Sequence, residues 1–107
     1  NLNVKRRHVV RTEKSLRDAR DHVLEIVFHE IGHHVYDVRA AADSSFVPFW
    51  QQLYNDADSY VTDYAKTDAE ENFAECYMSY VCHRKWLLNG RELELRAVER
   101  LFKSEVG

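Results

Sequence analysis

Residues 15–42 read SLRDARDHVLEIVFHEIGHHVYDVRAAA, and this stretch decides the fold because it combines helical periodicity with the absence of proline. It opens on Ser15-x-x-Asp18, a pattern typical of a helix N-terminus. At about 100° per residue, its apolar side chains form a stripe that should face a protein core. The sequence therefore predicts a long amphipathic helix over residues 15–42, with a stripe made of Leu16, Val23, Leu24, Val27, Ile31, Val35 and Val38.

The opposite face of this helix carries the pattern His-Glu-x-x-His, at His29, Glu30 and His33. Two histidines four residues apart lie about 40° apart around a helix and about 6 Å apart along it. Both imidazoles can therefore reach one zinc ion at about 2.0–2.1 Å. Glu30, beside the pair, can accept a proton from a zinc-bound water. The alternative is a chance match, which is uncommon in a chain of 107 residues with six histidines.

Gly32 lies inside this pattern. Glycine in a helix interior costs about 1 kcal/mol of helix stability relative to alanine. Close approach of another element would explain it, and the helix that supplies a third zinc ligand is the expected neighbour. Two nearby histidines are not expected to bind the metal. His34 falls on the apolar side of the helix, and His22 lies about 10 Å from His29 along the axis.

Helices are favoured in the rest of the chain as well, because three glycines and one proline leave few turn residues. Pro48 predicts a short second helix, since proline is favoured in a first helical turn. Thr67-x-x-Glu70 predicts the start of a helix that runs to about Leu88 and stops at Asn89-Gly90. A last helix is expected over residues 92–103, and a short N-terminal edge strand over residues 2–12.

Length and charge restrict the organisation and the partners. A chain of 107 residues is long enough for a single domain, so we expect one mainly α domain over residues 1–107. A net charge of −3 provides no positive field for nucleic acid or an anionic membrane surface. No segment approaches the roughly 18 apolar residues of a membrane span. We therefore expect no nucleic-acid and no membrane partner, and the oligomeric state is left open.

A third zinc ligand is expected from the helix that follows Thr67. Glu71 and Glu75 are four residues apart on one of its faces, in a stripe that also contains Ala74 and Met78. Unpaired carboxylates are costly to bury, and a divalent cation would remove that cost. The alternative is a solvated strip on a boundary helix.

Three elements of this sequence together resemble the gluzincin metallopeptidases of the anthrax-lethal-factor-like group, which includes the secreted Pro-Pro endopeptidases. They are the segment from His29 to His33, Tyr64, and Glu-Asn-Phe-Ala-Glu at residues 71–75, which begins seven residues beyond Tyr64. The resemblance covers roughly residues 24–82. It implies a compact zincin-like catalytic domain that binds Zn²⁺ and hydrolyses peptide bonds in a protein or peptide substrate.

The resemblance also implies individual roles. The zinc ligands would be His29, His33 and Glu71, and the general base would be Glu30. Tyr64 would stabilise the oxyanion or the leaving group, and Glu75 would be an acid behind the ligands. Separately, the spacing places Asp37 four residues after His33, where it either orients that imidazole or is an ordinary helix-end charge.

Other interpretations stay open at this stage. In the family, a substrate-binding sheet precedes the histidine helix, and here only about a dozen non-helical residues do, so the chain either has a reduced sheet or is a piece of a longer protein. The regulatory zincin peptidases that cleave phage-type repressors are similar but lack the tyrosine. A catalytically inactive, zinc-stabilised interaction domain is the non-enzyme alternative, with His22 or Glu75 as a fourth ligand.

The two cysteines leave the cellular compartment undecided. Cys76 and Cys82 are six residues apart on one predicted helix, about 240° around it, and cannot bond to each other. Unpaired cysteines favour a reducing compartment, whereas the resemblance implies secretion or delivery into another cell.

Overall fold

The computed structural model describes residues 13–84, and every regular element in this part is helical. The elements are α2 (Glu13–Ala42), α3 (Phe46–Asp56), the 3-10 helix η1 (Tyr64–Lys66) and α4 (Ala69–Cys82). The mainly α class is thereby confirmed. The strand expected over residues 2–12 and the helix expected over residues 92–103 lie outside the described residues. Within residues 13–84, no helix has the length and apolar character needed to cross a membrane.

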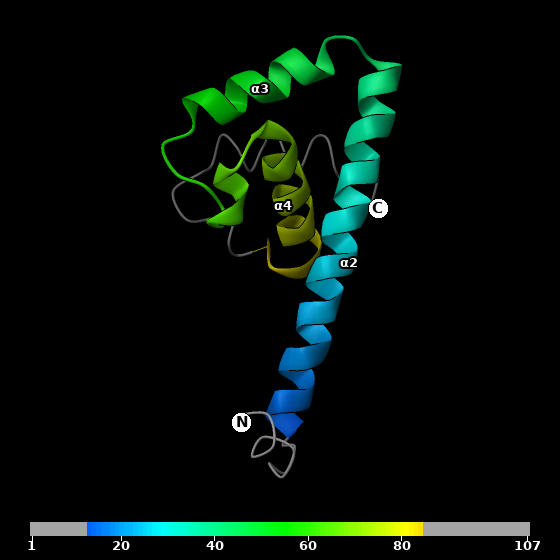
Figure 1. The fold of residues 1–107 in the computed structure, drawn as a ribbon, viewed down its shortest axis with the longest axis vertical. Coiled ribbons are helices and arrows are strands. Elements are labelled where there is room, and N and C mark those ends of the chain that lie inside the picture. The colour runs from blue at the N-terminus through cyan, green and yellow to red at the C-terminus, as the bar shows by residue number, and fades with distance from the viewer. Residues whose placement is uncertain (1–12, 85–107) are drawn as a thin grey trace, which may run out of the picture.

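The long helix α2 forms one side of the molecule, and α4 packs beside its C-terminal half (Figure 1). α3 crosses the end of this pair, and the first turns of α2 extend away from the other helices (Figure 1). α2 ends at Ala42, as predicted, and a turn at Asp43 leads into α3. In this turn the backbone N–H and the hydroxyl of Ser45 both donate to Asp43 Oδ1, and these bonds lower the pKa of the Asp43 carboxyl.

α4 differs from its predicted range at both ends. Its N-cap is Asp68, whose carboxylate accepts from the Glu71 N–H at 2.8 Å, whereas the sequence pattern placed the cap at Thr67. The helix ends at Cys82 and does not continue to Leu88. His83 leaves the helical backbone, with φ −143° and ψ 62°, and its Nε2 lies 2.7 Å from Glu25 Oε2 on α2. This contact with another helix ends α4 before the glycine that was expected to stop it.

The core is a group of aromatic rings where α2, α3 and α4 meet. Phe73 on α4 is fully buried at its centre, and its ring makes edge-to-face contacts with Tyr36, Phe46 and Trp50 at centroid distances of 5.5, 5.3 and 4.9 Å. Aromatic pairs prefer this geometry. The Trp50 indole N–H also donates to Asn72 Oδ1 at 3.1 Å, which satisfies its polar atom inside the core. Three helices are thus locked together around one residue of α4.

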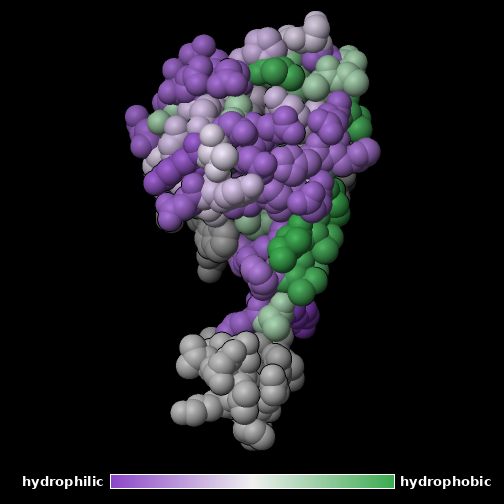
Figure 2. All heavy atoms as spheres, in the orientation of Figure 1, coloured by the Kyte–Doolittle hydropathy of each residue, from purple (hydrophilic) through white to green (hydrophobic). Residues whose placement is uncertain are grey.

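The face of α2 that packs on α4 is not the predicted one. Of the described members of the apolar stripe, only Val35 is buried, and the others, from Val23 to Val38, are 37–57% exposed. Hydrophobic side chains accordingly gather on the outside of α2 (Figure 2). His34, expected in the core or at its edge, is exposed as well. The prediction of a core-facing stripe is therefore wrong for this part of the chain.

Gly32 explains why α2 packs on α4 through a face other than the predicted one. A Cβ at Gly32 would lie 2.9 Å from Ala74 Cα and 3.1 Å from the Ala74 carbonyl oxygen. The missing side chain lets the two helix backbones approach closely on the Gly32 face, and this approach turns that face toward α4 and the apolar stripe away from it. The expectation that a helix approaches at Gly32 is confirmed, and that helix carries Glu71.

Candidate metal centre

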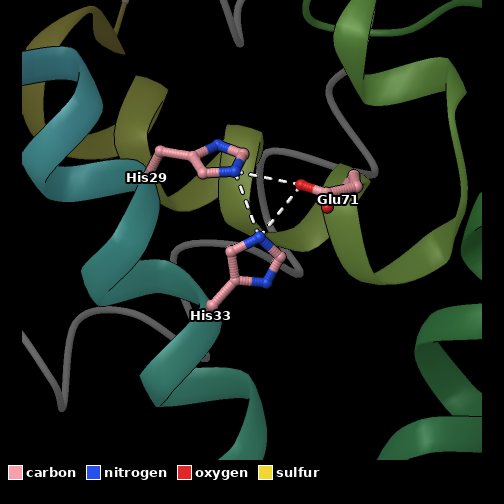
Figure 3. A group of neighbouring side chains, drawn as sticks. All are labelled: His29, His33 and Glu71. Atoms are coloured by element: carbon pink, nitrogen blue, oxygen red, sulfur yellow. Dashed lines mark hydrogen bonds and ion pairs between the residues drawn. The ribbon is translucent and has the colours of Figure 1, made fainter.

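Two histidines of α2 and one glutamate of α4 converge on one point between the helices (Figure 3). His29 Nε2 and His33 Nε2 are 3.1 Å apart, and Glu71 Oε1 lies 3.0 and 2.9 Å from them. All three side chains are largely buried. Two imidazoles and a carboxylate are donors that suit zinc, and acceptor atoms this close need a proton or a cation among them. The three residues predicted as ligands are therefore brought together, in an arrangement that fits a metal ion.

A carboxylate behind His29 fixes the orientation of its ring. Glu75, which is buried, accepts from His29 Nδ1 at 2.6 Å. The hydrogen on Nδ1 leaves the Nε2 lone pair directed at the cluster, since a neutral imidazole donates from one nitrogen and accepts at the other. A carboxylate in this position is a common partner of metal-binding histidines. The structure thus places Glu75 where the sequence analysis expected it.

Thr62 was not predicted and belongs to the same network. Its hydroxyl donates to the second oxygen of Glu75 at 2.6 Å and accepts from the Ala65 N–H at 3.2 Å. Ala65 is also held by Asn72, whose side-chain amide donates to its carbonyl at 3.2 Å. These bonds attach the segment that carries Tyr64 to α4 on both sides of the tyrosine. The signal for Thr62 in the sequence is weak, because a lone threonine in a loop follows no periodic pattern.

Tyr64 lies at the edge of the cluster with its side chain half exposed. Its ring centroid is 5.6 Å from that of His29. The negative charge of Glu71 is the largest of several causes that raise the pKa of the Tyr64 phenol above its ordinary value, and a hydrogen bond to the Glu71 carboxylate is another. The hydroxyl therefore keeps its proton at neutral pH and can donate a hydrogen bond, here to the Glu71 carboxylate.

A cavity of about 320 Å³ opens beside the cluster and brings together the other expected site residues. Glu30, exposed on α2, lines it together with His29, Tyr64 and Glu75. The remaining walls are formed by His22, Glu25, Ile26 and Met78. A small peptide segment placed in this cavity would contact the predicted base and the predicted hydroxyl donor at the same time.

Two residues considered in the sequence analysis do not join the cluster. Asp37 is exposed on α2 and makes no hydrogen bond or ion pair with His33 in the described part of the chain. The carboxylate near the outer nitrogen of His33 is instead that of Glu70, whose Oε2 lies 3.5 Å from Nδ1. His22 is mostly exposed and faces Glu25 at 3.8 Å, so it provides no fourth ligand.

The cysteines lie outside the cluster and form no disulfide with each other, as predicted. Cys76 is buried and Cys82 is partly buried. Burial is the main cause that raises the pKa of the Cys82 thiol, and the charges of Glu25 and Asp21 add to it. A thiol with a raised pKa is a poor nucleophile at neutral pH, so Cys82 is not a candidate catalytic residue.

Comparison with protein-family models, curated proteins and solved structures gives no match for this chain. The donor atoms of the cluster and the cavity beside it are therefore the features that support a function.

Proposed function

We propose that this chain is a zinc-dependent metalloendopeptidase domain of the gluzincin type. The observation that carries the proposal is the convergence of His29 Nε2, His33 Nε2 and Glu71 Oε1 next to a cavity lined by Glu30 and Tyr64. The donor set corresponds to a catalytic zinc site with two histidines and one glutamate, a type that keeps a position for water or substrate.

The chemistry follows from the positions of the side chains. A zinc ion held by His29, His33 and Glu71 would supply an acidified water and polarise a carbonyl group. Glu30 takes the proton of the attacking water and delivers it to the leaving amine. The Tyr64 hydroxyl donates a hydrogen bond to the carbonyl oxygen of the scissile peptide as negative charge develops there. Glu75 holds the His29 ring in the orientation that this arrangement requires.

The geometry favours an enzyme over a zinc-stabilised interaction domain. Structural zinc sites are closed by four protein ligands. Neither residue considered as a fourth ligand joins the cluster, since Glu75 is bonded to His29 Nδ1 and Thr62, and His22 is mostly exposed beside Glu25. The cavity on the Glu30 side of the cluster provides room for a water and a peptide.

Metal content and peptide cleavage, measured on the same sample, test the proposal. We expect one zinc per chain at neutral pH and cleavage of a proteome-derived peptide library that a chelator abolishes and zinc restores. Glu71→Ala should weaken zinc binding by more than about 100-fold, because loss of an outer partner already costs about 10–100-fold and here a ligand itself is lost. Asp58→Asn removes an exposed acid that is not among the converging residues and should change nothing. A wild-type chain that binds no zinc would overturn the proposal, and full zinc occupancy without any cleavage would favour the interaction domain.

Tyr64→Phe separates the proposed type of peptidase from the repressor-cleaving type. Removing one donor to a developing oxyanion commonly reduces kcat by about 10²–10³-fold, and we expect a loss in this range. Zinc affinity should fall much less than in Glu71→Ala, because the Tyr64 hydroxyl bonds to the Glu71 carboxylate but is not among the three donor atoms. Steady-state kinetics with a peptide from the library gives the result. Unchanged kcat in the Tyr64→Phe variant would favour the regulatory peptidases, which lack this tyrosine.

A further inference from the structure

The imidazole of His33 has a buried nitrogen without a hydrogen-bond partner. Its Nε2 lies 2.9 Å from Glu71 Oε1 and 3.1 Å from His29 Nε2, so Nε2 is the atom that faces the other ligands. A neutral imidazole whose Nε2 binds a metal carries its hydrogen on Nδ1. In the described part of the chain, His33 Nδ1 is buried and makes no hydrogen bond. His33 therefore presents a donor that needs an acceptor when its other nitrogen binds a metal.

His29 shows how the same requirement is met on the other ligand. Its Nδ1 donates to Glu75 Oε2 at 2.6 Å, and that carboxylate belongs to α4. The acceptor thus comes from the helix that also supplies Glu71. A similar partner for His33 would have to project from α4 near Glu71, within reach of the outer face of the ring.

Glu70 is the residue in that position. It precedes Glu71 in the first turn of α4, and its Oε2 lies 3.5 Å from His33 Nδ1. Bonds between an N–H group and a carboxylate are usually about 2.7–2.9 Å long, so a shift of less than about 1 Å would close the gap. The Glu70 side chain is 51% exposed and, among residues 13–84, forms no ion pair except this one, so it is free to move.

Asp37 does not provide this acceptor, although its spacing from His33 in the sequence is suitable. It lies four residues along the same helix and is exposed, with no contact to the His33 ring in the described part of the chain. Asp37 therefore offers a matched control, since it is a carboxylate near His33 in sequence that does not approach Nδ1.

We propose that Glu70 is a positioning residue of the metal site, which accepts a hydrogen bond from His33 Nδ1 when His33 Nε2 binds zinc. This inference rests on the proposed zinc site and goes beyond it, because it gives each histidine ligand its own carboxylate from α4. The short run Glu70-Glu71 then supplies one metal ligand and one outer acceptor from adjacent positions. Glu70 itself touches neither the metal nor the substrate.

Zinc affinity, measured by competition with a chelator of known affinity, tests the inference in Glu70→Ala, Glu70→Gln and Asp37→Ala. Loss of an outer partner of a ligand commonly weakens metal binding 10–100-fold, and we expect a loss of about this size for Glu70→Ala. Glu70→Gln keeps an acceptor oxygen without the charge and should recover part of the affinity. The zinc affinity of Asp37→Ala should stay within about twofold of the wild type, because Asp37 is not an outer partner of a ligand.

A second readout separates positioning from an effect of charge or of helix stability. In the zinc-bound protein, the His33 Nδ1 hydrogen should give a protected imidazole N–H signal by NMR, which Glu70→Ala abolishes and Asp37→Ala retains. Equal zinc affinity in Glu70→Ala and the wild type would overturn the inference, and so would equal losses in Glu70→Ala and Asp37→Ala. Failure of the wild type to bind zinc would instead overturn the proposed function.

Discussion

Glu30→Gln should leave zinc bound and reduce peptide turnover by about 10²–10⁴-fold, the range that general acid–base catalysis commonly contributes. Glutamine preserves the size of the side chain but cannot take the proton of the attacking water. Zinc binding should persist because Glu30 is not one of the three converging donor residues. The measurement is kcat with the best peptide of the library, together with the zinc content of the same preparation.

The environment of Glu30 makes this variant easy to interpret. The side chain is exposed on α2 and lines the cavity without a packing role, so unfolding stability should change by no more than about 0.5 kcal/mol. Asp21→Asn, at another exposed acid of the same helix, is a matched control that should retain full activity. Full activity of Glu30→Gln with zinc bound would contradict the mechanism. Loss of zinc together with activity would also contradict it, because Glu30 would then support the metal.

The local spacing of the site residues could be predicted because helix geometry fixes it. His29 and His33 are one turn apart on any α-helix, so their convergence needed only a helix at that place. The position of Glu71 depends on contacts between helices, and from the residues alone it was only a candidate until the resemblance supplied the pattern with Tyr64. Thr62 depends on how a loop folds against Glu75, and no local rule of sequence identifies such a contact.

The packing of α2 could not be read from hydrophobic periodicity. Periodicity identifies which side of a helix is apolar, and on α2 this is the side of Val27 and Ile31, which is exposed. The face in contact with α4 is selected by the closeness of the two backbones at Gly32 and by the aromatic contacts of Tyr36. A single glycine thus indicated the helix interface better than the apolar stripe did. The predicted end of α4 was wrong for a related reason, because His83 pairs with Glu25 on another helix.

Gly32→Val should remove zinc binding and destabilise the fold, because the space beside Gly32 is filled by the backbone of α4. A Cβ at this position would lie 2.9 Å from Ala74 Cα, whereas ordinary contacts begin at 3.4 Å. The helices must therefore separate by about 0.5 Å or more, and the two further methyl groups of valine add to this. We expect a loss of about 3 kcal/mol in unfolding free energy, measured by chemical denaturation of the metal-free chain. Ala41→Val, at an exposed position of the same helix, should cost less than about 0.7 kcal/mol.

Gly32→Ala separates the effect on the site from the effect on the fold. Alanine gains about 1 kcal/mol of helix propensity over glycine, which offsets part of the roughly 1–3 kcal/mol that its Cβ costs against the α4 backbone, so the metal-free chain should lose less stability than in Gly32→Val. At the zinc site, the gain in helix propensity does not compensate for a displacement of the ligands. His29 and His33 move together on α2, whereas Glu71 moves with α4, and ligand distances in a zinc site tolerate only about 0.2 Å. A helix separation of about 0.5 Å exceeds that tolerance and should weaken zinc binding about 100-fold in a chain that still folds. Unchanged zinc affinity in Gly32→Ala would mean that α4 reaches the metal without the close approach at Gly32, and that the glycine serves the packing of the helices alone.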